Sequence, residues 1–220
     1  PSLDADEYML SLAETDPIVR AQIERGDWVA LAEGNMFRRH YFKIEHDWPR
    51  RARLLRSWDF AGTEPREGAD PDWTVGFLAG EYDGQYWLID MVRDRLTPKG
   101  VEALVLQTAM LDGRDVEIII EQEPGSSGKT VIQDYQQRIL RGFAVSTTNE
   151  GKPPSGAKST RARPFSSAAE AGNVFMVEGP WNSAFLDEVP LFPFGAHDDI
   201  VDTVASAINY FNRFPALTTW

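Results

Sequence analysis

Residues 53–59, Arg-Leu-Leu-Arg-Ser-Trp-Asp, form an apolar, strand-like run that ends in a carboxylate. The stretch Val116-Glu-Ile-Ile-Ile-Glu121 repeats this pattern, and His197-Asp198-Asp199-Ile-Val-Asp202 places further acids at the start of an amphipathic segment. Carboxylates at the end of a buried strand or the start of a helix are held rigidly where water is scarce. If the three groups converge, they would bind divalent cations. We therefore expect a metal-dependent enzyme that cleaves phosphodiester bonds.

The sequence around these acids predicts an α/β fold. Asp83-Gly84 separates two strand-like runs and predicts a tight turn, so the two runs are expected to pair as an antiparallel hairpin. Strand, helix, strand and helix after a hairpin imply a mixed sheet, with parallel strands beside the hairpin and helices on its faces. In chain order, we expect strands at 54–60, 73–80, 86–93 and 116–120, an edge strand at 173–177, helices at 97–111, 129–140, 181–189 and 198–211, and a loop at 149–164.

The first 50 residues have a different pattern from the rest of the chain. Helical spacing of apolar side chains at 4–13 and 16–25 predicts two short helices, with Asp16-Pro17 as a helix start. We expect residues 1–50 to form a helical linker or appendage and residues 51–220 to form the α/β domain. The chain begins with Pro1 rather than Met, which suggests a piece of something longer.

The composition narrows the chemistry of the site. The 220 residues include no cysteine, so disulfides, thiolate zinc sites and a cysteine nucleophile are excluded. The histidines, His40, His46 and His197, are not spaced as a zinc site, so oxygen ligands are expected for any metal. There is no apolar run long enough to span a membrane and no signal-peptide pattern. We therefore expect an intracellular protein without a membrane partner.

The distribution of charge favours a DNA partner more than the net charge does. The net charge of −12 argues against nucleic acid, because DNA binding usually needs a basic surface. Two basic clusters, within 38–56 and 152–163, change this interpretation when they are combined with a metal site. Either cluster alone is more typical of a solvated surface. The candidate DNA-contacting residues are Lys129, Lys158, Arg161 and Arg163.

Each acidic group also has a structural explanation, which stays open at this point. Asp59 could end its strand in a turn, and Glu121 could form an ion pair with Lys129 or an arginine. The acids within 197–202 are also expected as caps of a helix and as favourable charges near its dipole. Helical geometry does not decide between Asp198 and Asp199 as the ligand. The auxiliary candidates are Asp72, Glu123, His197 and Asp202.

One segment approaches the phosphate-binding pattern Gly-x-x-x-x-Gly-Lys-Ser/Thr without matching it. Glu123 stands where the first glycine belongs, and Pro124 removes a backbone donor. Glu121 and Glu123 would also repel a triphosphate. An ATP-binding motor fragment built around Gly128-Lys129-Thr130 is therefore the weakest alternative, although Lys129 suits a single phosphate of a DNA backbone.

Taken together, these segments resemble the nuclease domain of the large terminase subunit of tailed bacteriophages and prophages. Gly26-Asp27-Trp28 is also similar to the segment that joins the motor domain to the nuclease in that family. Many members have aspartate where this chain has Glu121. The matching features are Trp58-Asp59, Asp70-Pro-Asp72-Trp-Thr-Val, Ile120-Glu121 followed by Pro124-Gly125-Ser-Ser-Gly128, Lys158-Ser-Thr-Arg161-Ala162, and His197-Asp198-Asp199-Ile-Val-Asp202.

The resemblance implies a ribonuclease H-like fold that cuts double-stranded DNA concatemers during genome packaging. Asp59, Glu121 and the Asp198-Asp199 pair would bind two Mg²⁺ or Mn²⁺ ions, roughly 3.5–4 Å apart and sharing Asp59. The implied partners are a motor domain, a small terminase subunit and a portal protein, in the cytoplasm of a bacterial host. The second alternative is a non-catalytic docking module of the packaging complex, in which the acids serve only as caps and ion pairs.

Overall fold

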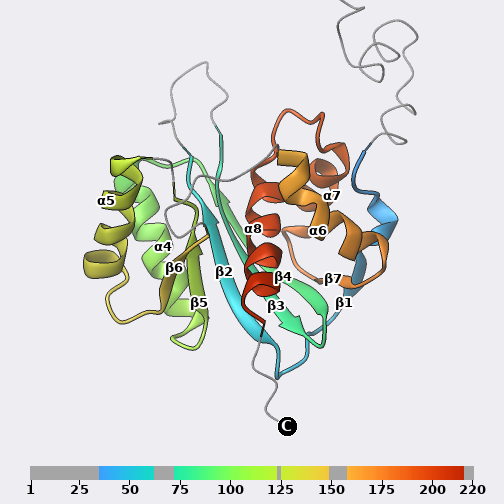
Figure 1. Cartoon of the computed structure of the whole chain (residues 1–220), viewed down its shortest axis with the longest axis horizontal. Coiled ribbons are helices and arrows are strands. Elements are labelled where there is room, and N and C mark those ends of the chain that lie inside the picture. The colour runs from blue at the N-terminus through green and yellow to red at the C-terminus, as the bar shows by residue number, and fades with distance from the viewer. Residues whose placement is uncertain (1–34, 62–71, 123–124, 149–157, 216–220) are drawn as a thin grey trace, which may run out of the picture.

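The computed structural model describes residues 35–61, 72–122, 125–148 and 158–215 (Figure 1). Several expectations fall on the remaining residues. The helices expected at 4–13 and 16–25, the segment Gly26-Asp27-Trp28, Glu123, and the first part of the loop expected at 149–164 lie outside the described residues.

Within the described residues, a seven-stranded mixed sheet runs in the order β1-β7-β4-β3-β2-β5-β6. β2, β3 and β4 pair antiparallel, while β5 is parallel to β2 and to β6, and β7 is parallel to β4 and to β1. The predicted combination of a hairpin and parallel strands in one sheet is confirmed. The strands are β1 (Lys43–Glu45), β2 (Arg53–Asp59), β3 (Thr74–Tyr82), β4 (Gln85–Asp94), β5 (Glu117–Ile120), β6 (Val145–Thr147) and β7 (Val174–Val177).

β3 and β4 form the predicted hairpin. Tyr82 pairs with Gln85 across the turn, and the two turn residues, Asp83 and Gly84, have φ angles of 52° and 73°. Positive φ at both central positions is typical of the tight turn that matches the twist of the flanking strands, and Asp-Gly tolerates it well. The turn residues therefore fix the register of the hairpin.

Helices lie on both faces of the sheet (Figure 1). On one face are α4 (Pro98–Asp112) and α5 (Ser126–Asp134), and on the other are α6 (Lys158–Glu170), α7 (Asn182–Glu188) and α8 (Asp199–Arg213). Three shorter helical segments are η1 (Arg39–Tyr41), η2 (Tyr135–Ile139) and η3 (Val189–Leu191). In the part of the chain that the structure describes, no helix is both long and apolar enough to cross a membrane.

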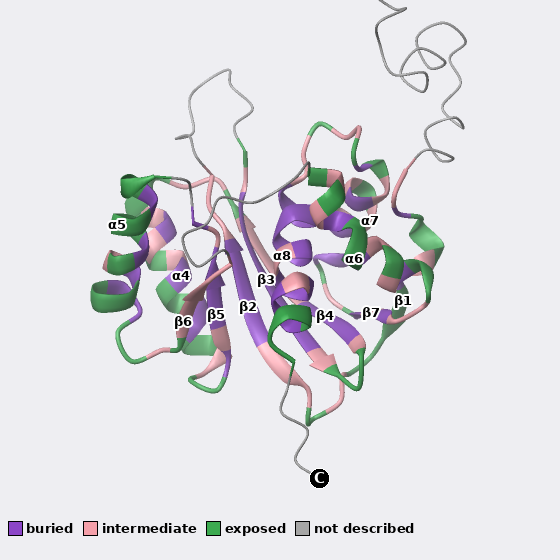
Figure 2. Cartoon of the chain, viewed as in Figure 1, coloured by how far each residue is buried: buried purple, intermediate pink, exposed green. Residues whose placement is uncertain are grey.

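The isoleucines of β5 show how the sheet divides the core. Ile118 and Ile120 belong to the apolar cluster that includes Val105 of α4. Ile119 belongs to the cluster that includes Ile208 of α8, on the opposite face. Side chains alternate along a strand, so an unbroken apolar run is buried on both faces of a covered sheet. Figure 2 shows the same division, with buried positions concentrated in the central strands and on the sheet-facing sides of the helices.

The prediction of a loop at 149–164 is wrong from Lys158 onward, because α6 begins there. Ala162, Phe165 and Ala169 are buried at helical spacing and pack α6 into the core. Pro164 and the small polar residues around it weaken the helical signal in the sequence, since proline removes a backbone donor. The basic residues of this segment therefore lie on a rigid element.

β7 is not the edge strand that the sequence predicted, because β1 pairs with its outer side. The residues of β1, Lys43 to Glu45, are exposed and short of apolar character, so they gave no strand signal. β6, three partly buried residues long, was also not predicted. The division into an appendage at 1–50 and a domain at 51–220 stays a prediction, within which residues 43–45 contribute a strand to the sheet.

Candidate functional site

Asp59 and Glu121 lie at the carboxyl ends of two neighbouring parallel strands. Asp59 is the last residue of β2, and Glu121 directly follows β5. Trp58 is opposite Ile120 in the ladder, and the N–H of Glu121 donates to the carbonyl of Trp58 over 3.0 Å. Adjacent parallel strands end at the same edge of a sheet, where α/β folds place their ligand sites. The two carboxylates therefore reach the same cleft.

The first turns of α8 complete this acidic cleft. Asp199 and Asp202 are each only 7% exposed, and their helix packs on β2 and β3. The cleft has a volume of about 230 Å³, which is several times the space of one water molecule. Its described lining has six acidic side chains and two basic ones. These lining residues are Asp59, Phe60, Asp72, Glu121, Lys158, Arg161, Asp198, Asp199 and Asp202.

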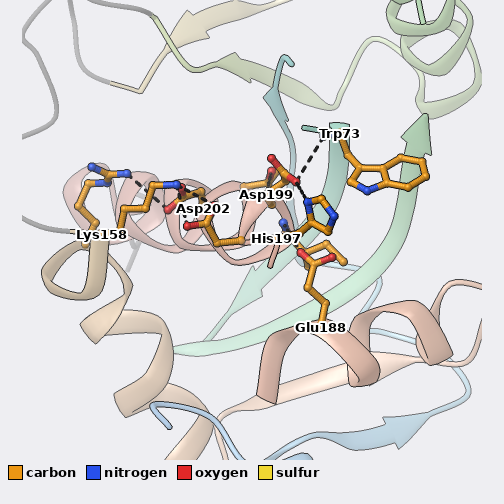
Figure 3. A network of polar contacts seen from close by, with 10 residues as sticks. Trp73, Lys158, Glu188, His197, Asp199 and Asp202 are labelled. Atoms are coloured by element: carbon orange, nitrogen blue, oxygen red, sulfur yellow. Dashed lines mark hydrogen bonds and ion pairs between the residues drawn. The ribbon is translucent and has the colours of Figure 1, made fainter. Parts of the chain in front are cut away.

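Capping does not account for the acids at the start of α8. The side chain of Asp198 makes no capping hydrogen bond, and the N–H of Ile200 donates instead to Glu188 Oε1 over 3.2 Å. Asp199 Oδ2 accepts a hydrogen bond from the N–H of Trp73 at 3.4 Å (Figure 3). Glu188 thus supplies the cap from the end of α7, a position that carried no signal in the sequence.

Lys158, at the start of α6, forms ion pairs with two of these acids (Figure 3). Its Nζ lies 2.7 Å from both carboxylate oxygens of Asp198 and 3.1 Å from Asp202 Oδ2. One turn later, Arg161 Nη2 lies 3.4 Å from Asp202 Oδ1. Burial lowers the pKa of Lys158, but the hydrogen bond to Asp198 and the charge of Asp202 outweigh burial and raise it. Lys158 therefore stays protonated beside the acids.

The other acids are held in an environment that disfavours their charge. Burial raises the pKa of Asp59 well above its ordinary value, and the charges of Glu121, Asp202 and Asp199 raise it further. Burial is likewise the main reason why the pKa values of Glu121, Asp199 and Asp202 are raised. Clustered, desolvated carboxylates favour either a proton or a cation. The cleft can therefore exchange protons for metal ions.

Among the residues that the structure describes, Asp72, His197 and Asp199 form the one group of acids and histidines with the spacing of metal ligands. One potential ligand atom from each residue lies within 4.8 Å of the other two. His197 Nδ1 is 3.9 Å from Asp199 Oδ2 (Figure 3). Carboxylate oxygens suit hard cations such as Mg²⁺ and Mn²⁺, and an imidazole nitrogen also suits Zn²⁺. The donors of the cleft therefore fit the divalent ions that the resemblance implies.

Two of the four candidate DNA-contacting residues lie elsewhere. Among the residues that the structure describes, Lys158 and Arg161 line the acidic cleft, whereas Lys129 and Arg163 do not. Lys129 and Arg163 are exposed on α5 and α6. The positive charges of Arg161 and Lys158 act on Glu121 and lower its pKa, which opposes the effect of burial. An arginine and a lysine other than Lys129 therefore provide its electrostatic partners.

Part of the first basic cluster is structural. Arg56 is 1% exposed and donates two hydrogen bonds to Asp112, at 2.7 and 2.8 Å, and one to Asp90 at 3.0 Å. Arg53 pairs with Glu117 at 2.7 Å. These arginines connect β2 to α4, β4 and β5, so they do not form a DNA-binding surface. The position of Arg56 among the apolar residues of a predicted strand could have indicated this structural role.

A family model described as "Terminase RNaseH-like domain" matches residues 56–211. The matched range contains Asp59, Glu121, Asp199 and Asp202, which meet in the cleft. A search of curated protein sequences found no significant match.

Solved structures of large terminases share the fold. The chain is similar to the large terminase nuclease of thermophilic phage G20c with bound zinc, at a TM-score of 0.54 and 15% identity, over 77% of this chain and 94% of that one. The magnesium-bound form of that nuclease is similar at a TM-score of 0.54 and 14% identity, over 79% of this chain and 96% of that one. The large terminase of thermophilic bacteriophage D6E is similar at a TM-score of 0.54 and 13% identity, over 79% of this chain and 44% of that one. The chain thus spans less than half the length of the D6E protein.

Proposed function

Because the chain belongs to the terminase RNaseH-like domain family, we propose that it is a divalent-metal-dependent DNA endonuclease. It is the nuclease part of a phage or prophage large terminase and cuts double-stranded DNA concatemers during genome packaging. The observation that carries this proposal is the meeting of Asp59, Glu121, Asp199 and Asp202 in one cleft. They come from three elements far apart in the sequence, and their raised pKa values favour cation binding.

We assign two ligand groups to two ions, Mg²⁺ or Mn²⁺. The charges of Glu121, Asp202 and Asp199 all act on Asp59, which supports Asp59 as the shared ligand. The G20c nuclease has been solved with bound magnesium and with bound zinc, in agreement with a divalent cation in this fold. The first group is Asp59, Glu121 and Asp202, and the second is Asp72, His197 and Asp199.

The ion pairs favour Asp199 over Asp198 as the ligand. Both oxygens of Asp198 accept from Lys158, whereas Asp199 belongs to the group with metal-ligand spacing. Asp198 therefore positions Lys158 in this assignment. Asp202, an auxiliary candidate in the sequence, becomes a principal ligand because it is buried beside Glu121 and raises the pKa values of Glu121 and Asp59.

The residues of the chain prepare the cleft for hydrolysis. When bound, the metal ions would supply an activated water and stabilise the charge on the departing oxygen. β2 and β5 hold Asp59 and Glu121 rigidly, so little reorganisation is needed when these carboxylates lose their protons. Lys158 and Arg161 border the cleft and would contact backbone phosphates, which position DNA without reading its sequence. Cleavage is therefore expected to show little sequence preference.

The remaining parts of the proposal follow from the family. The chain spans 44% of the D6E large terminase, so we expect it to act with an ATP-driven motor domain. A small terminase subunit and a portal protein are the other expected partners, and the expected location is the cytoplasm of a bacterial host. Pull-down with a motor domain and a portal protein would test the partners separately from the chemistry.

A plasmid-nicking assay tests the proposed activity. We expect the chain to nick supercoiled DNA in Mn²⁺, and we expect Asp59→Ala to lose at least about two orders of magnitude of the rate, since Asp59 is the shared ligand. Asp115→Asn is the matched control, because Asp115 is exposed and does not line the described part of the cleft. Full activity of Asp59→Ala would refute the ligand assignment.

A calorimetric Mn²⁺ titration separates the nuclease from a docking module. The nuclease binds Mn²⁺ in the cleft, and Asp59→Ala weakens that binding. A docking module, whose acids serve only as caps and ion pairs, binds no cation at millimolar Mn²⁺ and gives no nicking.

A further inference from the structure

One stripe of α8 leads away from the acidic cleft and is not covered by the core. Along α8, the residues from Asp199 to Phe211 are buried except Ser206 and Asn209. These two follow Asp202 at intervals of four and three residues, and Arg213 follows after four more, so all four share one face of the helix. The stripe therefore runs from a proposed metal ligand through two polar side chains to a cation.

This stripe is one wall of a second cavity that adjoins the acidic cleft. The cavity has a volume of about 200 Å³. It shares Glu121, Arg161 and Asp202 with the cleft, so the two spaces are adjacent. At the shared end the lining is acidic, and away from it the lining is basic and polar. The lining residues used below are Thr148, Arg161, Ser206, Asn209 and Arg213.

Thr148 supplies an independent sign of a ligand. Its Oγ1 is buried, and among the described residues it has no hydrogen-bond partner. A buried hydroxyl without a partner is costly, and such groups in native proteins call for an explanation such as a bound water, ion or ligand. Thr148 is one of the residues that line the second cavity, so a ligand bound there is the explanation that we take up.

Building on the proposed function, we propose that this second cavity binds the backbone phosphates of the DNA strand that is cut, next to the phosphate held in the acidic cleft. Guanidinium groups bind phosphate oxygens with two parallel hydrogen bonds, and hydroxyl and amide groups supplement them. Arg161 lies at the junction of the two spaces and Arg213 at the other end of the stripe. The strand therefore runs along α8, and these contacts set its register over the metals.

Three residues of the cavity also have structural contacts. Asn209 Nδ2 donates to the carbonyl of Arg161 over 3.0 Å and so links α8 to α6. Arg161 itself pairs with Asp202. A substitution at either position would disturb the fold or the cleft, so neither is suited to a test. Arg213 also contacts the protein, since its guanidinium lies 5.1 Å from the centre of the Phe214 ring. Thr148 and Arg213 are the positions tested, with the fold of each variant checked.

The test measures DNA binding by fluorescence anisotropy of a labelled duplex, with Ca²⁺ in place of Mn²⁺. Thr148→Val removes the hydroxyl and keeps the shape of the side chain, and Thr148→Ser keeps the hydroxyl. Arg213→Gln removes the cation, and Arg141→Gln is its control because Arg141 is exposed and lines neither described cavity. Thermal melts and Mn²⁺ calorimetry on each variant check the fold and the metal site.

We expect Thr148→Val and Arg213→Gln to bind DNA several-fold to about tenfold more weakly. For Arg213→Gln, the slope of log affinity against log salt should fall by about one, the loss of one phosphate contact. Thr148→Ser and Arg141→Gln should bind as the unmodified chain does, and all four variants should bind Mn²⁺ normally. Thr148→Val should not lower the melting temperature, since it removes an unsatisfied buried hydroxyl.

The inference is overturned if the chain nicks DNA in Mn²⁺ while Thr148→Val, or a folded Arg213→Gln, keeps the original DNA affinity. If Arg213→Gln does not fold, Thr148→Val decides alone. The proposed function fails in a different way, namely if the unmodified chain binds DNA but neither binds Mn²⁺ nor nicks. A loss of DNA affinity in the two variants would support the phosphate site even then.

Discussion

Asp59 is the proposed shared metal ligand, and its charge also weakens the metal-free fold. Its carboxylate is desolvated beside Glu121, Asp202 and Asp199, and its pKa is raised well above the ordinary value of 3.8. A carboxyl whose folded pKa is raised stabilises the fold below its unfolded pKa, and this contribution is lost as the pH rises through the folded pKa. At neutral pH the metal-free fold is therefore weakened by the carboxylate that we propose as the shared ligand.

Replacing Asp59 with asparagine should make the metal-free protein more stable. We expect Asp59→Asn to raise the free energy of unfolding by about 0.5–2 kcal/mol at pH 7, because it removes the charge that the cleft disfavours. The difference should shrink as the pH falls toward 4, where Asp59 of the unmodified chain is protonated. Urea unfolding in EDTA across this pH range measures it, with Asp115→Asn as the control. A less stable Asp59→Asn at every pH would contradict this description of the cleft.

Mn²⁺ affinity should depend on pH above the range of ordinary carboxylates. Asp59, Glu121, Asp199 and Asp202 all have raised pKa values, and each must lose its proton before it can bind a metal. Affinity is therefore expected to rise with pH well beyond the ordinary values of 3.8 and 4.5, and calorimetric titrations at several pH values measure it. Affinity that is already constant from pH 5 upward would argue against protonated ligands.

Lys158 should compete with the metal for the acids. Its ammonium lies 2.7 Å from Asp198 and 3.1 Å from Asp202, so it repels an incoming cation and occupies ligand oxygens. Lys158→Met should raise Mn²⁺ affinity by about tenfold, which is the effect of roughly 1.4 kcal/mol. It should also lower metal-free stability, because Asp202 loses a partner. Lys99→Met, an exposed lysine of α4, is the control, and unchanged Mn²⁺ affinity in Lys158→Met would count against competition.

At the level of single residues, the sequence indicated the acids at the strand ends, Asp59 and Glu121, more clearly than it indicated the roles of the acids at the start of α8. Asp59 and Glu121 could be found because a carboxylate that ends a buried run stands out in one dimension. The roles of Asp198, Asp199 and Asp202 depended on which of them met Lys158 or Trp73, and those contacts join residues far apart in the chain. The cap from Glu188 depended in the same way on the packing of α7 against α8.

Among the elements, β2 places the site and depends on a glycine in its neighbour. Gly76 of β3 is opposite Trp58, the residue before Asp59. A Cβ at Gly76 would lie 2.6 Å from the ring of Trp58, which is 1% exposed. Only glycine therefore leaves room for the ring to cross β3.

Gly76→Ala should destabilise the fold by about 1–3 kcal/mol, since overpacking displaces Trp58. It should also weaken Mn²⁺ binding, because Asp59 moves with the end of β2. Gly80→Ala on the same strand is the matched control, since its Cβ would meet its neighbours at 3.3 Å, and a smaller loss is expected. Urea unfolding measures the loss of stability in each of the two variants. Equal losses would show that Trp58 has space to move.

The elements were predictable where the apolar pattern was strong. The hairpin, β5, α4 and α8 follow from periodicity and from turn or cap residues. α6 was not predicted because its buried stripe consists of Ala162, Phe165 and Ala169 around Pro164. β1 and β6 are each three residues long, and they exist through pairing with neighbours that the sequence does not reveal.

At the scale of the whole molecule, net charge conceals how the surface is organised. The chain carries −12, yet the cavity along α8 joins an acidic end to a basic end. Two arginines of the first basic cluster, Arg53 and Arg56, form ion pairs inside the fold. Metal ions would neutralise the acidic end, so DNA affinity is expected to depend on divalent cations more than on the overall charge.

The central claim is that acids from β2, β5 and α8 share divalent cations in one cleft. Anomalous diffraction from Mn²⁺-soaked crystals of this chain tests it most directly. Manganese peaks are predicted in the cleft, one bonded to Asp59, Glu121 and Asp202 and one beside Asp72, His197 and Asp199. An empty cleft at an Mn²⁺ concentration that supports nicking, or peaks bonded to other residues alone, would contradict the claim.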